Sequence, residues 1–292
     1  MAKILVAGAS GYLGKHIVKE LEAWEIPAVA VLRSAKKLND LTLNTTDIIE
    51  AEVTKPETIR GVCEGIDAVI STVGITRQLD GLTYRDVDYQ ANLNLMNEAK
   101  RSGVRKFIYV SVIDGEMLRH LKMVDAKERF VDALKDSGMG YTIIRPNGFY
   151  SDLEEILQMA SRGRVYLFGD GEFKLNPIHG ADLAEVCVRA IAKNEKEIRI
   201  GGPDILTQNE IAGLALSAMD KSINIVHMPD WIRRLILSGT RMLTDEDFHG
   251  PIEFFLTLIA RDNIAERYGT RRLNDYFNQK AHTKMHGYNH SL

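Results

Sequence analysis

Cysteine is scarce in this chain. Cys63 and Cys187 are its two cysteines in 292 residues, and both stand in otherwise helical patterns. A thiol in such a place behaves as a small buried hydrophobe, so we expect neither a disulfide nor a cysteine metal site. An apolar run of the roughly 18–20 residues that a membrane span requires is lacking too. The two nearest candidates, 231–237 and 254–260, are too short.

A signal-peptide pattern is also lacking, because the N-terminus runs directly into the first expected strand. With no such segment and no membrane span, we expect a cytoplasmic location or an equivalent reducing compartment. Metal-ligand patterns are missing as well. His282, His286 and His290 recur every fourth residue, but no acidic residue or cysteine stands among them. We therefore expect no metal and a frayed polar terminus.

Strong charge of either sign is absent. The 37 Lys and Arg residues face 40 Asp and Glu residues, so the formal net charge is -3 at pH 7. This balance excludes the basic class of nucleic-acid binders, and we expect no nucleic-acid partner. An apolar fraction of 45% and a charged fraction of 26% are ordinary for a globular protein. The length suits one large domain, or a core domain with an elaborated second part.

A glycine-rich turn stands near the start of the chain. The apolar run Ile4–Ala7 ends in glycines at positions 8, 11 and 14, and an amphipathic segment follows. In a dinucleotide-binding unit these glycines allow the tight turn, the approach of a pyrophosphate and the close packing of the helix. The helix N-terminus then offers free N–H groups and a partial positive charge. We expect nucleotide binding here; the alternative is an ordinary strand-to-helix turn.

The end of the second expected strand, 28–32, lacks an acidic residue. In a dinucleotide fold an acidic side chain at this point binds the 2′-hydroxyl of NAD, whereas an arginine accommodates the 2′-phosphate of NADP. Here Arg33 comes first, and Lys36 and Lys37 follow. A guanidinium matches a phosphate in bidentate geometry. The sequence therefore favours NADP (NADPH); the alternative is that Arg33 begins a solvated basic loop.

Strand-like runs and helical patterns alternate six times over about the first 146 residues. This alternation predicts βαβ units and an α/β Rossmann fold, a doubly wound parallel sheet with right-handed crossovers. Beyond this point the alternation loosens and helices predominate. We expect an NAD(P)-binding domain over 1–147 and a smaller, mostly helical substrate or partner lobe over 148–292, intertwined with the core. Capping boxes at 54–57 and 207–210 predict two helix starts.

Ligands of such a sheet lie outside the carboxyl ends of its strands. The expected strand ends fall at residues 8–14, 33–37, 52–53, 71–76, 111–115 and 145–149. From these segments and the following helix we expect the cofactor to be bound by Gly8, Ala9, Ser10, Gly11, Tyr12, Leu13, Gly14, Arg33, Lys37, Glu52, Val53, Thr72, Val73, Gly74, Lys127, Pro146 and Asn147.

Several motifs match a known family. They are Gly8-Ala-Ser-Gly-Tyr-Leu-Gly14, Val69-Ile-Ser-Thr-Val-Gly74, Val87-Asp-Tyr-Gln-Ala-Asn92, Phe107-Ile-Tyr-Val-Ser111, Arg145-Pro146 and Ile178-His-Gly-Ala-Asp182. In these motifs the chain resembles the short-chain dehydrogenase/reductase superfamily, in its extended and atypical branch. More closely it resembles NmrA-like NAD(P)-binding proteins, including the complex I accessory subunit branch and chloroplast assembly factors. The resemblance covers roughly residues 1–200.

The resemblance also implies where chemistry would take place. Typical members carry a Ser at the end of the fifth strand, and a Tyr and a Lys four residues apart on the next helix. The Lys holds the ribose and lowers the pKa of the Tyr, which exchanges a proton with the substrate. Ser111 and Lys127 match this pattern, but Met123 stands where the Tyr is expected. His120, at the start of the same helix, is a further candidate proton donor.

Each of these three candidates has a plainer alternative. Lys127 as a ribose-binding or proton-shuttling residue competes with a solvated helix lysine, although no acid lies at helical pairing distance along the helix. Ser111 could equally satisfy a backbone group at the end of the strand. His120 could be a surface residue.

Two functions remain open from the sequence. One is an NADPH-dependent oxidoreductase acting on an apolar or aromatic small molecule such as a quinone, because 148–292 is rich in Phe, Leu, Ile and Met. Such residues are, however, mostly core. The other is a non-catalytic NADP-binding redox sensor or an assembly or scaffold protein. The missing Tyr favours it, as does the amphipathic stretch 231–241, which could face a protein partner or a membrane surface.

Overall fold

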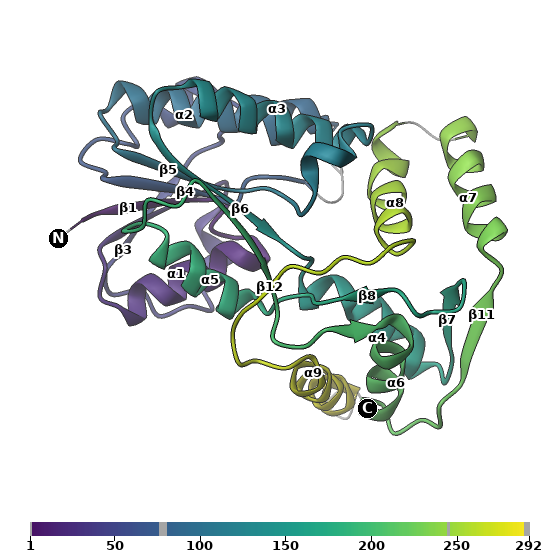
Figure 1. The fold of residues 1–292 in the computed structure, drawn as a ribbon. Helices are drawn as coiled ribbons and strands as arrows, with labels where there is room; N and C mark the ends of the chain where they lie inside the picture. Colours follow the sequence, from purple (N-terminus) through teal and green to yellow (C-terminus); the bar gives the residue numbers. More distant parts are fainter. Residues whose placement is uncertain (1, 76–80, 244–245, 289–292) are drawn as a thin grey trace. The chain divides into compact units, whose positions relative to one another are not determined.

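The computed structural model describes residues 2–75, 81–243 and 246–288 (Figure 1). The chain divides into two compact units. The first comprises Met1–Arg145 and Leu183–Arg199, and the second comprises Pro146–Asp182 and Ile200–Leu292. The chain therefore passes between the units three times. The segment Leu183–Arg199, which falls within the range expected to form the C-terminal lobe, lies in the first unit.

Within the described residues, eight strands form one parallel sheet in the order β12-β9-β6-β5-β4-β1-β2-β3 (Figure 1). These strands are β1 (Ile4–Ala7), β2 (Ala28–Leu32), β3 (Thr46–Glu50), β4 (Ala68–Ser71), β5 (Lys106–Val110), β6 (Gly140–Pro146), β9 (Glu197–Gly201) and β12 (Glu266–Arg267). The chain builds outward from β1 in both directions, so the strand order reverses between β1 and β4. The predicted α/β doubly wound parallel sheet is confirmed, and a ligand crevice is expected at that reversal.

Helices cover both faces of the sheet in the first unit. Figure 1 shows α2 (Asn92–Arg101) and α3 (Lys122–Asp136) on one face, and α1 (Tyr12–Ala23) and α5 (Gly180–Arg189) on the other. Strands buried on both faces need continuous apolar runs. The sequence meets this requirement, because every residue of β1, β2 and β4 is buried. The edge strand β3 is mostly exposed and accordingly contains polar residues.

The capping box expected at 54–57 is wrong. The chain there forms only a short 3-10 helix, η2 (Pro56–Ile59), which has no side-chain cap. The hydroxyl of Thr54 instead donates to Glu52 at 3.1 Å, and that of Thr58 donates to the carbonyl of Glu52 at 2.8 Å. These local bonds compete with helix formation. The remaining short helical elements of the first unit are the 3-10 helices η1 (Ala35–Leu38) and η4 (Gly115–Leu118) and the π-helix η3 (Arg85–Ala91).

The second unit is mostly helical. Its elements are η5 (Tyr150–Leu153), α4 (Glu154–Ser161), β7 (Val165–Phe168), β8 (Lys174–Leu175), β10 (Leu206–Thr207), α6 (Gln208–Ala218), β11 (Ile225–Met228), α7 (Asp230–Leu243), α8 (Glu246–Leu258) and α9 (Leu273–Tyr288). The capping box at the start of α6 is confirmed: the Thr207 hydroxyl accepts from the N–H of Glu210, and the Glu210 carboxylate accepts from the N–H of Thr207.

Two kinds of feature are absent from the part of the chain that the structure describes. No helix there is long and apolar enough to cross a membrane. No group of three His, Cys, Asp or Glu side chains among them could hold a metal ion. His290 of the histidine repeat lies outside the described residues, and so does residue 76 of the expected strand end 71–76.

Candidate functional site

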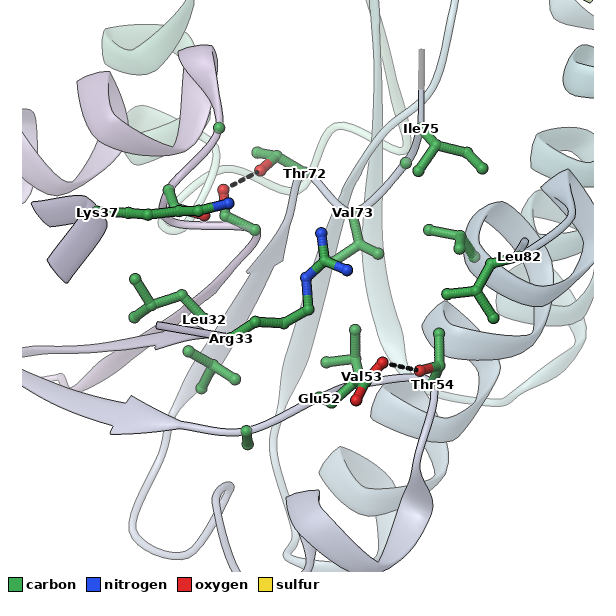
Figure 2. A pocket seen from close by; sticks show the side chains of 17 residues that line it. Leu32, Arg33, Lys37, Glu52, Val53, Thr54, Thr72, Val73, Ile75 and Leu82 are labelled. Carbon is green, nitrogen blue, oxygen red and sulfur yellow. Dashed lines mark hydrogen bonds between the residues drawn. The ribbon is translucent and has the colours of Figure 1, made fainter. Parts of the chain in front are cut away.

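The carboxyl ends of β1, β2, β3 and β4 surround a pocket of about 300 Å³ in the first unit (Figure 2). It lies at the reversal of strand order, where a doubly wound sheet opens a crevice. The pocket is lined by Gly8, Ser10, Gly11, Val31, Leu32, Arg33, Lys37, Ala51, Glu52, Val53, Thr54, Thr72, Val73, Gly74, Ile75, Leu82 and Val87.

The glycine turn forms one wall of this pocket. Gly8 has a φ of 78°, and a β-carbon there would lie 2.6 Å from the hydroxyl of Thr72. A β-carbon on Gly14 would collide with the carbonyl of Gly8 and lie 2.8 Å from Cα of Ala9. The turn therefore requires glycine at both positions. It delivers the chain into α1 directly after Gly11, so the first N–H groups of α1 stand beside the pocket, where they favour an anion.

Two cationic side chains enter the pocket from β2 and its following turn. Arg33 comes directly after β2, and Lys37 belongs to η1. Figure 2 shows the guanidinium of Arg33 reaching into the middle of the pocket and the Lys37 side chain extending in from η1. The site thus offers a forked donor and a point charge to the same ligand, a combination suited to a phosphate.

Glu52 is the acidic residue among those that line the pocket. Its carboxylate is already paired: Oε2 lies 2.7 Å from Nζ of Lys55, and Oε1 accepts from Thr54 at 3.1 Å. The hydrogen bond from Lys55 lowers the pKa of Glu52 against the opposing effect of burial, and the charge of Arg33 adds to the lowering. The carboxylate of the lining is therefore compensated by a lysine that does not itself line the pocket.

Lys127 does not line the pocket, but its ammonium lies close to the lining residue Gly74. Its Nζ is 2.7 Å from Oδ1 of Asp88, which is fully buried, while the Lys127 side chain is 12% exposed. Burial alone would lower the pKa of Lys127, but the Asp88 carboxylate outweighs it and the pKa lies above its ordinary value. A β-carbon on the lining residue Gly74 would lie 2.6 Å from both charged atoms. The ion pair therefore stands directly against the backbone of Gly74.

The Tyr109 ring lies near this ion pair. It does not replace the tyrosine that the family pattern places at the position of Met123. The ammonium of Lys127 stands 5.9 Å from the centre of the Tyr109 ring, and the ring is completely buried. Burial raises the pKa of the Tyr109 phenol, and the charge of Lys127 only partly opposes this rise. A buried phenol that holds its proton so firmly is a poor proton donor to a ligand.

Ser111 belongs to a separate buried network. Its hydroxyl donates to Oε1 of Glu128 at 2.8 Å, and the same carboxylate pairs with Arg145 at 2.6 Å. Both ion-pair partners are almost completely buried. A side chain on Gly115 would collide with the Glu128 carboxylate, so the chain approaches this pair closely. Ser111 therefore helps to satisfy a buried charge and does not line the pocket.

His120 and Met123 lie near the start of α3 but occupy different environments. His120 is an exposed residue of the turn before the helix, whereas Met123 is buried within it. Neither lines the pocket. The three residues that the sequence suggested for catalysis, Ser111, Lys127 and His120, are thus not gathered around one cavity in the described structure.

Ten of the seventeen residues expected to bind the cofactor line the pocket. The other seven do not. Ala9, Leu13 and Gly14 are buried, Tyr12 packs edge-on against His16, and Lys127 pairs with Asp88. Pro146 and Asn147 belong to the second unit, where the Asn147 amide donates to Asn176 at 2.7 Å and to the backbone of Asn263.

Sequence reasoning missed seven lining residues and one charged partner. Val31, Leu32, Ala51 and Thr54 border strand ends that were expected, so extending each range by one or two residues would have included them. Ile75 falls within the expected strand end 71–76, and Val87 and Asp88 stand in the motif 87–92, but no pattern indicated their contacts, because these depend on how the segment after β4 returns to the sheet; Leu82 carries no comparable signal.

The chain is similar in sequence and in fold to known proteins. A family model described as NAD(P)H-binding matches residues 8–194. The photosystem II assembly factor Ycf39 of Synechocystis sp. is 27% identical over 244 residues, covering 82% of this chain and 74% of that one. The NAD(P)H azoreductase of Xenophilus azovorans is 24% identical over 226 residues and 76% of each chain. The NADPH-dependent quinone oxidoreductase QOR2 of Escherichia coli, complexed with NADPH, has a similar fold, with a TM-score of 0.72 at 18% identity over 95% of this chain and 99% of that one.

Proposed function

The chain belongs to the NAD(P)H-binding family, and on that premise we propose that it binds NADPH in preference to NADH. The observation that carries this proposal is the presence of Arg33 and Lys37 in one pocket with the glycine turn. A 2′-phosphate would meet a guanidinium and an ammonium there. A 2′-hydroxyl would find the Glu52 carboxylate already paired with Lys55.

The remaining lining residues fit the rest of a dinucleotide. The turn Gly8–Gly11 and the N-terminus of α1 would hold the pyrophosphate, because backbone N–H groups and the helix dipole favour negative charge. Leu32 and Val53, at the ends of β2 and β3, offer apolar surface to an adenine. Thr72, Val73 and Gly74 would line the path toward the nicotinamide. When bound, the cofactor supplies a hydride.

We propose further that the protein reduces conjugated aromatic acceptors such as quinones. Reducing an aliphatic ketone leaves an alkoxide, whose conjugate acid has a pKa of roughly 16, close to that of water. Such a reaction needs a protein acid, and Met123 stands where the family has one. Reducing a quinone leaves a phenolate, whose conjugate acid has a pKa of about 10, like tyrosine. Water can protonate it, so the acceptor gains two electrons and one proton from the cofactor's hydride and its second proton from solvent.

An acceptor panel tests this proposal. The purified protein is given NADPH with a benzoquinone, a naphthoquinone, an azo dye and an aliphatic ketone, and NADPH oxidation is followed at 340 nm. We expect turnover with the two quinones, whose reduction leaves a phenolate, and none with the ketone. Substituting Met123→Tyr should leave quinone reduction within about twofold, because no protein acid is required. Binding of NADPH without oxidation by any conjugated acceptor would refute the enzymatic part.

That last outcome would favour a second function, a non-catalytic NADPH-binding assembly or scaffold protein. One structural observation supports it. Helix α7 exposes Trp231 and Leu235, which are 63% and 62% accessible, beside the exposed Arg234. Large exposed apolar side chains gathered on one helix are typical of a surface that contacts another protein. The similarity to an assembly factor points in the same direction.

A further inference from the structure

A second pocket, of about 380 Å³, lies in the first unit at the opposite end of the sheet from the pocket that holds Arg33. Its lining comes from the amino ends of β4, β5 and β6 and from the segment between α5 and β9. Three of the described lining residues are cations, Arg105, Lys106 and Lys196, and Asp67 is the acidic one. The volume falls within the range of small-molecule sites, which is roughly 300–1,000 Å³.

Asp67 and Arg105 compensate each other. Oδ1 of Asp67 accepts from the Arg105 guanidinium at 2.5 Å, and Oδ2 accepts from the backbone N–H of Lys3 at 2.9 Å. The bond from Lys3, followed by that from Arg105, holds the pKa of Asp67 below its ordinary value. The carboxylate is therefore ionised and already bonded, and it does not neutralise the two lysines of the pocket.

Lys106 is a cation held in place by uncharged groups. Its ammonium donates to the carbonyl of Ala190 at 2.6 Å and to the carbonyl of Lys193. An ammonium has three N–H donors, so these two bonds leave one for a ligand. Bonding the carbonyls that follow α5 accounts for the position of Lys106. It does not account for a second lysine in the same pocket.

Lys196 supplies that second charge. Its ammonium lies 4.3 Å from the centre of the Tyr141 ring, a contact that orients the cation without neutralising it. In the part of the chain that the structure describes, no carboxylate pairs with Lys106 or Lys196, and the nearby Glu195 pairs with Lys193. Burial lowers the pKa of Lys106, and the charge of Lys196 lowers it further, against the opposing effect of Glu195. The two ammonium groups of the pocket therefore repel each other.

We propose that this second pocket binds a small organic phosphate, with the phosphate group between the ammonium groups of Lys106 and Lys196 and the apolar part of the molecule against Ile191. A phosphate monoester carries a charge of about −1.5 to −2 at pH 7, so it would remove the repulsion between the two cations. Both lysines have N–H donors for its oxygens, and such charge-assisted bonds are strong. The inference does not depend on the proposed NADPH binding, because the two pockets share no lining residue.

The test is a calorimetric titration of the full-length protein with phenyl phosphate at pH 8 and constant ionic strength. We expect saturable binding to the wild type. Lys196→Met should weaken it about tenfold or more, because a charge-assisted hydrogen bond is lost. The matched control is Lys193→Met, which removes an exposed lysine that does not line the pocket and changes the net charge equally. Lys193→Met and Arg33→Ala should each stay within about twofold of the wild type, because neither residue belongs to the second pocket.

Two further measurements separate the phosphate from the rest of the probe and the charge from the shape of the lysine. Phenol, which lacks the phosphate, should not bind, and Lys196→Arg, which keeps the cation, should retain most of the affinity for phenyl phosphate. The inference is overturned if the wild type shows no saturable binding, or if Lys193→Met weakens binding as much as Lys196→Met. It is also overturned if Arg33→Ala alone abolishes binding, because the phosphate would then occupy the first pocket.

Discussion

Arg33 is the residue on which the choice of cofactor depends most directly. It enters the pocket beside Lys37, and its guanidinium can donate two charge-assisted hydrogen bonds to a phosphate. We predict that Arg33→Ala lowers the preference for NADPH over NADH at least tenfold, because such bonds contribute about 1.5–3 kcal/mol each. Competitive titration with both cofactors measures the ratio. Lys36→Ala, a neighbouring exposed cation that does not line the pocket, should leave it unchanged. An unaltered ratio in Arg33→Ala would show that another group reads the phosphate.

The roles of some residues could be predicted from the sequence, and the roles of others could not. Gly8 and Arg33 could be predicted because their roles depend on the local turn and on the end of one strand. Asp88 could not, because its partner Lys127 lies 39 positions later and the pair exists only once η3 packs on α3. Ser111 was found at the expected strand end, but its bond to Glu128 depends equally on a distant helix.

At the scale of elements, Glu98 connects α2 to the start of the segment that follows η2. Its carboxylate accepts from the N–H of Gly61 at 2.7 Å and from Arg101 at 2.7 Å. The hydrogen bond from Arg101 lowers the pKa of Glu98 despite the opposing effect of burial. A carboxyl whose folded pKa is lowered stabilises the protein above its unfolded pKa, and this contribution is lost as pH falls through the folded value.

We therefore predict that Glu98→Gln reduces the free energy of unfolding by about 1–2 kcal/mol at pH 7, and by much less near pH 3. Urea denaturation at several pH values measures the difference. Glu64→Gln removes the exposed partner of the same arginine and should cost less than about 0.5 kcal/mol at any pH. A Glu98→Gln effect that does not change with pH would mean that the side chain acts through packing.

Elements were predictable where one physical requirement dominated. The buried strands β1 and β2 are continuous apolar runs, and the positions expected for them agree with the structure. The capping box predicted at 54–57 does not form. The hydroxyl groups of this segment make local hydrogen bonds instead, and the helix ends after one turn. Helix α2 is preceded directly by the π-helical η3, and no periodicity in the sequence marks that irregularity.

At the scale of the whole molecule, we expect ligand binding to stabilise mainly one of the two units against thermal unfolding. A ligand present at 100 times its Kd stabilises the folded state by about 2.7 kcal/mol, which corresponds to roughly 5–11 °C in Tm for a unit of this size. The chain contains two tryptophans, Trp24 in the first unit and Trp231 in the second. Single-tryptophan variants therefore report on each unit separately during thermal unfolding.

We predict that NADPH raises the melting temperature reported by Trp24 in a Trp231→Phe background. Arg33→Ala in that background should show a much smaller rise at the same NADPH concentration, because the affinity is lower. If NADPH shifts only the transition reported by Trp231, its principal site lies outside the pocket of the first unit.

The three passages of the chain between its units also bear on how the protein is made. The first unit needs Leu183–Arg199, and the N–H of Ile143 on β6 donates to Lys196 just before β9. At a synthesis rate of about 5–20 residues per second, roughly 3–11 s separate the emergence of β6 from that of β9. During this interval the growing polypeptide carries an unpaired strand edge of the first unit while the second is still being translated. A nascent chain in that state is a natural client for a chaperone at the ribosome.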